Sequence, residues 1–105
     1  MPFGLKDEIV ARIHSVFSKF PEIEKALVYG SRAKGNFKSG SDIDLTLLGA
    51  NIDLKTLNRI ELAIDELMLP WTFDISIFNH LDNPDLIDHI KRVGEVFYDA
   101  KQLKA

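Results

Sequence analysis

Two segments with the character of strands, 25–29 and 42–48, are joined by a connection of only about a dozen residues. The connection is rich in glycine, serine and lysine, which predicts a short helical turn followed by a surface loop. Parallel strands need a longer crossover, usually with a complete helix, whereas antiparallel strands tolerate a short link. We therefore expect these two strands to pair antiparallel and the sheet that contains them to be mixed.

The rest of the chain alternates between helical and strand patterns. The helical spacing of apolar residues ends before Pro21 and again before Pro70, because proline cannot continue a helix. Asn83 and Pro84 are the residue types of an N-cap and a first helical position, and Gly94 is expected to end that helix. The predicted helices span 9–20, 53–69 and 84–94, and the later strands span 71–78 and 95–98.

Length and composition suit one small globular domain over residues 1–105, with an α/β (α+β) fold and a mixed sheet of about four strands flanked by helices. The 13 basic and 16 acidic side chains give a net charge of −3, which argues against a broad basic face for duplex nucleic acid. The absence of cysteine excludes a disulfide framework and suits a reducing cytoplasm. The sequence has neither an apolar run of about 18 residues nor an initial signal peptide, so we expect a cytoplasmic protein without membrane contact.

Three aspartates are candidates for the chemistry of this chain. Strand alternation places Asp42 and Asp44 on one face, and Asp74 has the same relation to its own strand. If the two strands are neighbours, three carboxylates converge, which is unfavourable unless cations neutralise them. Carboxylate oxygens are the ligands that Mg²⁺ prefers, so the pattern predicts a divalent metal site.

The segment before these aspartates has the features of a phosphate site. Gly30 and Ser31 stand where a strand ends and a helical turn begins, and backbone N–H groups at such a point attract phosphate. Residues 30–41 also contain Arg32, Lys34 and Lys38 and no acidic residue. A cationic loop beside a carboxylate cluster indicates a site for a nucleoside triphosphate with its Mg²⁺. The two lysines are otherwise expected to serve as solvated loop charges.

The two motifs together resemble a known family. Gly30–Gly35 (GSRAKG) followed by Ser41–Leu45 (SDIDL) is similar to the signature of the polymerase-β-type nucleotidyltransferase superfamily. Within it the sequence most resembles the minimal nucleotidyltransferases, the MntA-like antitoxins encoded beside HEPN-domain partners. The resemblance extends over nearly the whole chain, and it departs from the family at Lys34, where many relatives have arginine.

This resemblance implies a palm-like nucleotidyltransferase fold and nucleotidyl transfer from ATP. In such a reaction an acceptor oxygen attacks the α-phosphate and pyrophosphate leaves. Asp42 and Asp44 would hold both Mg²⁺ ions, and Asp74 would complete the catalytic metal site and help to activate the acceptor hydroxyl. The implied acceptor is a tyrosine of a HEPN toxin, whose RNase activity the added AMP would silence.

The resemblance also implies the residues that bind the nucleotide. Gly30 and Ser31 would hold the β- and γ-phosphates, and Arg32 and Ser41 are further candidates. For Arg32, a structural salt bridge is an equally good interpretation.

Two other functions stay open at this point. The first is nucleotide transfer to a small molecule, as in aminoglycoside-modifying relatives, which usually carry a second helical domain for the acceptor. The second is an antitoxin that binds its toxin without catalysis. The three histidines, His14, His80 and His89, share no metal-ligand spacing, so we expect surface or capping roles for them.

Overall fold

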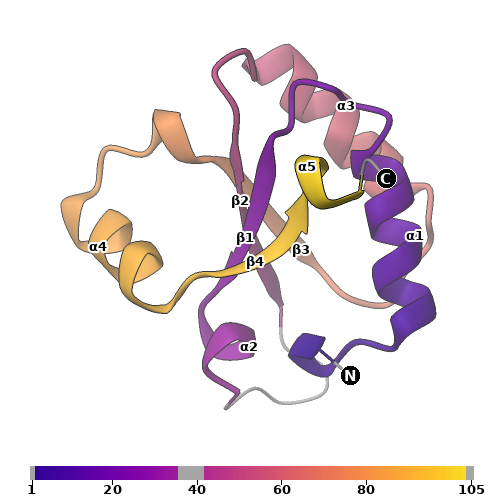
Figure 1. The fold of residues 1–105 in the computed structure, drawn as a ribbon, viewed down its shortest axis with the longest axis horizontal. Coiled ribbons are helices and arrows are strands. Elements are labelled where there is room, and N and C mark those ends of the chain that lie inside the picture. Colours follow the sequence, from indigo (N-terminus) through magenta and orange to yellow (C-terminus); the bar gives the residue numbers. More distant parts are fainter. Residues whose placement is uncertain (1, 36–41, 104–105) are drawn as a thin grey trace.

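A computed structural model describes residues 2–35 and 42–103, and its central element is a four-stranded sheet in the order β3-β2-β1-β4 (Figure 1). The strands are β1 (Lys25–Tyr29), β2 (Ile43–Leu48), β3 (Phe73–Ile77) and β4 (Glu95–Asp99). β1 pairs antiparallel with both β2 and β4, whereas β2 and β3 are parallel. The expected antiparallel first pair and the mixed sheet are both confirmed.

Helices lie on both sides of this sheet. Figure 1 shows α1 and α3 on one side and α4 on the other. The helices are α1 (Asp7–Phe17), α2 (Ser31–Lys34), α3 (Leu54–Asp65), α4 (Pro84–Val93) and α5 (Ala100–Leu103), with short 3₁₀ turns at Pro2–Gly4 and Phe78–His80. Within the described part of the chain, none of these helices is both long and apolar enough to cross a membrane.

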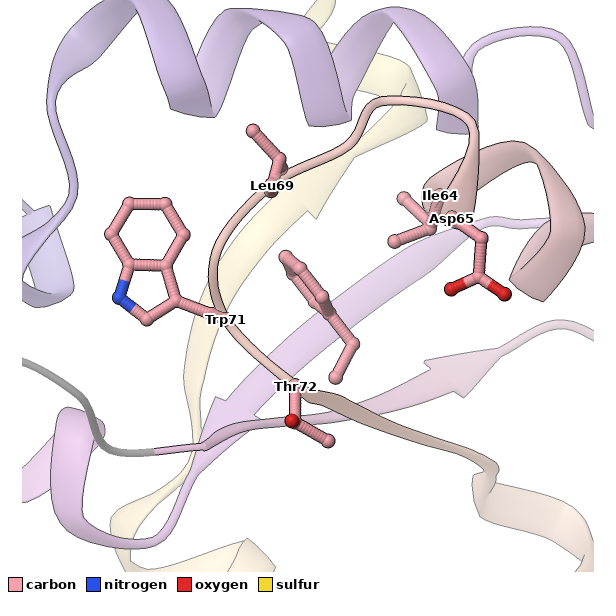
Figure 2. Close-up of a pocket in the computed structure, with 6 residues that line it drawn as sticks. Ile64, Asp65, Leu69, Trp71 and Thr72 are labelled. Carbon is pink, nitrogen blue, oxygen red and sulfur yellow. The ribbon is translucent and has the colours of Figure 1, made fainter.

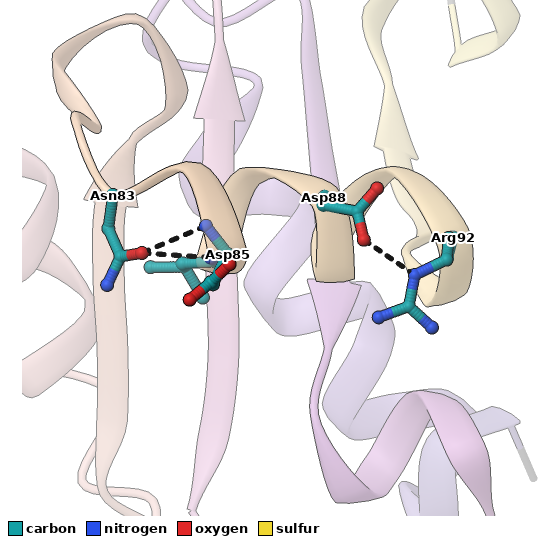
Figure 3. A network of polar contacts seen from close by, with 5 residues as sticks. Asn83, Asp85, Asp88 and Arg92 are labelled. Atoms are coloured by element: carbon teal, nitrogen blue, oxygen red, sulfur yellow. Dashed lines mark hydrogen bonds and ion pairs between the residues drawn. The ribbon is translucent and has the colours of Figure 1, made fainter.

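The start of α4 follows the sequence prediction. The Asn83 side chain accepts hydrogen bonds from the backbone N–H groups of Asp85 and Leu86, at 3.0 and 3.3 Å, and Pro84 occupies the first turn (Figure 3). Near the other end of the helix, Arg92 donates to the Asp88 carboxylate at 2.9 Å. The Asn83 cap satisfies N–H groups at the start of the helix, which the helix itself leaves without partners.

Two predicted helices are shorter in the structure than in the sequence analysis. α1 ends at Phe17 because the next residues form tighter turns, in which the Phe20 N–H donates to the Phe17 carbonyl at 3.0 Å. α3 ends at Asp65, and Met68 then has a positive φ of 56°, which no α-helix accommodates. Apolar residues beyond these ends, such as Phe20, are wholly or partly buried although they are not helical. They therefore extend the apolar spacing of the sequence past the true end of each helix.

The two faces of the sheet differ in character. On the face toward α1 and α3, alternate strand residues are almost completely buried: Ala26, Val28, Ile43, Leu45, Leu47, Ile75 and Ile77. The intervening residues face the α4 side and include Tyr29, Asp44, Thr46, Asp74 and Ser76. The core therefore occupies one side of the sheet, and the polar candidates occupy the other.

We predict that Leu45→Ala lowers the free energy of unfolding by about 2–5 kcal/mol, because it removes a fully buried side chain and leaves a cavity in a packed core. Urea denaturation measures this change. Leu62→Ala is the matched control, since Leu62 is 62% exposed on α3 and its truncation should change stability by no more than about 0.5 kcal/mol. Equal losses in the two variants would contradict the assignment of the core to this face.

Candidate active site

The aspartates of β2 and β3 lie side by side. Asp44 and Asp74 are register partners in the parallel β2–β3 ladder, and adjacent strands are roughly 4.8 Å apart. Asp42 is exposed and directly precedes β2, two residues before Asp44. The condition set by the sequence analysis, that the two strands be neighbours, is therefore met.

The ionised form of Asp44 is disfavoured, relative to its protonated form, in this position. Burial raises the pKa of Asp44 above its ordinary value, and the negative charges of Asp74 and Asp42 raise it further. His89 acts in the opposite direction and lowers the pKa of Asp44. A partly buried acid between two like charges is an arrangement that a cation would stabilise.

Tyr29 is a member of the site that the sequence analysis did not single out. It is buried at the end of β1, it is the register partner of Asp44, and its hydroxyl shares a hydrogen bond with Ser76. Burial raises the pKa of Tyr29, and the charges of Asp74 and Asp44 add to this effect. Strand alternation could have found it, because Tyr29 occupies the position that faces away from the core.

A further hydrogen bond continues across the floor of the site. The Ser76 hydroxyl donates to Thr46 Oγ1 at 3.0 Å, and Thr46 is completely buried on the central strand β2. Together with Tyr29, these side chains connect β1, β2 and β3 on the same face as the aspartates. Such a bonded polar network holds the strands in one register beside the carboxylates.

His89 lies closer to the site than the sequence analysis expected. Its ring meets the Tyr29 ring edge to face, with 6.3 Å between the ring centroids. The imidazole comes from α4 and is half-buried, so a surface or capping role does not describe it. Nothing in the sequence marked His89, because its partner Tyr29 is 60 positions away in the chain.

Gly30 brings the backbone into direct contact with Asp44. Its φ of +74° and ψ of −152° fall in a region that is essentially restricted to glycine. A Cβ atom at this position would lie 2.5 Å from Asp44 Oδ2, closer than real Cβ atoms approach other atoms. Gly30 therefore allows both the turn into α2 and the close approach to the carboxylate.

Arg32 is buried within the protein, only 2% exposed. Its Nη1 donates to the Phe3 carbonyl at 2.8 Å, and its guanidinium lies over the Trp71 ring, 5.8 Å from the centroid. Burial lowers the pKa of the guanidinium. Arg32 thus contacts a backbone carbonyl and an aromatic ring inside the protein, and nucleotide binding by Arg32 stays a prediction.

The other residues of the predicted phosphate site are placed only in part. Ser31 is half-buried as the first residue of α2, and Lys34 is exposed at the end of that helix. Ser41 and Lys38 lie outside the described residues. Among residues 2–35 and 42–103, no three His, Asp or Glu side chains are gathered closely enough to form a metal site, so the metal prediction is not confirmed.

A small pocket lies where the chain enters β3 (Figure 2). Its volume is about 230 Å³, and it is lined by Ile64, Asp65, Leu69, Trp71, Thr72 and Phe73. Phe73 packs against the core, whereas the next residue, Asp74, faces the opposite side of the sheet. The pocket is thus separated from the carboxylates by the strand and is not part of the candidate site.

Comparison with known proteins places the chain in a family. The family described as "Polymerase beta, Nucleotidyltransferase" matches residues 11–103. The chain belongs to this nucleotidyltransferase family. It is also 29% identical over 72 residues to the protein "Probable protein adenylyltransferase MntA" of Haemophilus influenzae (strain ATCC 51907 / DSM 11121 / KW20 / Rd). That match covers 68% of this chain and 63% of the Haemophilus influenzae protein, less than two thirds of that relative's length.

Solved structures confirm the palm-like nucleotidyltransferase fold. A crystal structure of a toxin–antitoxin with AMP-PNP has a TM-score of 0.69 and 17% identity, and the likeness covers 89% of this chain and 75% of that one. The complex of a tri-AMPylated Shewanella oneidensis HEPN toxin with an MNT antitoxin gives a TM-score of 0.57 and 15% identity, over 91% of this chain and 71% of that one. At these identities the likeness establishes the fold alone.

We predict that Gly30→Ala destabilises the chain more than Gly35→Ala does. Gly35 lies in the left-handed helical region, which costs an alanine about 1–2 kcal/mol, and a Cβ at that position meets nothing within 4 Å. Gly30 lies in a region that is essentially restricted to glycine, and its Cβ would also collide with Asp44 Oδ2. Urea denaturation of both variants measures the difference.

A double-mutant cycle tests whether the additional loss of stability in Gly30→Ala comes from contact with Asp44. Gly30→Ala should cost less in an Asp44→Ala background, because the colliding oxygen is then absent. An unchanged cost would show that backbone conformation alone requires the glycine.

Proposed function

We propose that this chain is a Mg²⁺-dependent nucleotidyltransferase that transfers AMP from ATP to a tyrosine hydroxyl of a HEPN-domain toxin and so acts as an antitoxin. The observation that carries the proposal is the register of Asp44 with Asp74 beside Gly30, in a member of a nucleotidyltransferase family. The likeness to a toxin–antitoxin with AMP-PNP and to an AMPylated HEPN toxin in complex with its antitoxin supports it. We also place the activity in the cytoplasm.

The oxygen donors of the site suit Mg²⁺. Asp42, Asp44 and Asp74 offer hard carboxylate oxygens, the donors that Mg²⁺ prefers. Burial, and after it the negative charges of Asp74 and Asp42, raise the pKa of Asp44, and a divalent cation would offset this destabilisation of the carboxylate. When bound, two such ions would activate the attacking oxygen and neutralise the charge of the departing pyrophosphate.

The other residues of the site would position the nucleotide and the acceptor hydroxyl. Gly30 and Ser31 would bind the β- and γ-phosphates through the turn between β1 and α2, with Ser41 as a further nucleotide ligand. Asp74 would help to activate the acceptor hydroxyl by accepting its proton, and the hydroxyl oxygen would then bond to the α-phosphorus. The bond from that phosphorus to the oxygen bridging the β-phosphate breaks, and pyrophosphate leaves. In phosphoryl-group chemistry of this kind, orientation and charge stabilisation provide most of the acceleration.

We predict that Asp44→Asn abolishes transfer of label from α-³²P-ATP to a HEPN-domain protein, because the variant loses a carboxylate that both metal sites need. Asp82→Asn, which changes an exposed loop aspartate, should label the acceptor as the unchanged protein does. Undiminished labelling by the Asp44 variant would overturn the mechanism.

The label-transfer assay and an assay of cell protection separate the alternatives. Labelling of an aminoglycoside-type small molecule without any protein acceptor would favour the small-molecule enzyme. Protection of cells from the toxin by Asp44→Asn, as strong as protection by the unchanged protein, would favour an antitoxin that acts by binding alone.

We predict that Asp44→Asn leaves the melting temperature unchanged or raises it when no divalent cation is present. An acid whose folded-state pKa is raised destabilises the fold above that pKa, and the penalty disappears below the unfolded-state pKa. Asparagine removes the penalty at every pH, so the unchanged protein should gain stability relative to Asp44→Asn as the pH falls through the raised pKa toward the unfolded-state pKa.

Adding Mg²⁺ completes this test. It should raise the melting temperature of the unchanged protein and of Asp82→Asn, because a ligand of the folded state stabilises it. It should not raise that of Asp44→Asn. A large loss of stability in Asp44→Asn without added cation would contradict the charge conflict inferred at this site.

A further inference from the structure

His89 belongs to the α4 side of the candidate site. The helix is anchored by Ile90, which is 1% exposed, whereas Asp88 on the other side of His89 is exposed and paired with Arg92. His89 is half-buried, and its ring stands at 80° to the ring of Tyr29. The side chain is thus directed toward the sheet rather than toward solvent.

Tyr29 connects this imidazole to both parts of the site. It is the register partner of Asp44 across the β1–β2 ladder, and it directly precedes Gly30 in the chain. A ring packed against Tyr29 therefore lies on the same face of the sheet as Asp44, against the strand that leads into the turn that the proposed function assigns to phosphate. The effect of His89 on Asp44, whose pKa it lowers, agrees with this proximity.

The chemistry of the site calls for a hydrogen-bond donor at this position. The aspartates and a nucleoside triphosphate are all negatively charged, and the buried Arg32 guanidinium is engaged with the Phe3 carbonyl. An imidazole has at least one N–H in either charge state, so His89 can donate to a phosphate oxygen without a change of protonation.

We propose that His89 is a nucleotide-binding residue whose imidazole N–H donates a hydrogen bond to a phosphate oxygen of the bound nucleoside triphosphate. This inference rests on the proposed function and adds α4 to the elements that form the binding site. The other histidines are placed differently: His14 Nε2 lies 2.6 Å from the Phe97 carbonyl oxygen, and His80 is exposed.

The test is a titration of ATP with Mg²⁺ by calorimetry on four proteins. His89→Phe keeps an aromatic edge against Tyr29 but removes the donor, and it should raise the Kd for ATP about tenfold, the effect of a lost hydrogen bond to a charged group. His89→Gln keeps an N–H donor and should stay within about threefold of the unchanged protein. His80→Phe, the matched control, should leave the Kd unchanged.

Melting temperatures separate a lost contact from a damaged fold. If His89→Phe does not fold, His89→Ala decides the same question, because alanine suits a helix position. Unchanged ATP binding by a folded His89 variant overturns the proposal, and so does an equal loss in the Phe and Gln variants. If the unchanged protein does not bind ATP with Mg²⁺, the proposed function fails and this inference fails with it.

Discussion

The register of β2 with its two neighbours is the constraint on which the candidate site depends. Asp44 stands opposite Tyr29 on one side and Asp74 on the other. A slip of one residue in either pairing would turn a strand over and direct its polar side chains into the core. Leu45 and Leu47 prevent such a slip, because both are completely buried on the opposite face. Apolar burial on one side of the sheet thus fixes the polar arrangement on the other.

The site contains two local features that a folded sheet usually avoids. Asp44 is an acid held beside two others, and Gly30 has a backbone conformation that other residues avoid. The neighbouring strand β3 otherwise alternates between apolar residues on the core side and polar residues on the other side. Local conflicts of this kind are expected where a protein binds or reacts rather than where it merely folds. Under the proposed function, both have a purpose, since the acids bind cations and the glycine admits a phosphate.

Most of the fold could be predicted from the sequence because its signals are local. Strand alternation placed Asp44 and Asp74 on matching faces, and the short link before Asp42 required an antiparallel first pair. The Asn83 cap was equally clear, since capping depends on neighbouring residues.

The parts that escaped prediction depend on contacts between distant segments. His89 joined the site only because α4 packs against β1, and the burial of Arg32 depends on Phe3 and Trp71. The helix ends were misplaced for a related reason. Phe20 is buried by tertiary packing, so it continued the apolar pattern beyond the true end of α1. Apolar periodicity indicates which residues are buried, but it does not indicate the backbone conformation of those residues.

The hydrogen bond from Arg32 to the Phe3 carbonyl has a practical consequence. It connects the turn Pro2–Gly4 to α2, the helix that follows Gly30. The backbone at Phe3 therefore helps to position the proposed phosphate turn. A purification tag or fluorescent fusion joined directly before Phe3 would disturb this hydrogen bond. Fusions for binding measurements are therefore better designed with a flexible spacer at that end, so that the label does not alter the affinity it is meant to report.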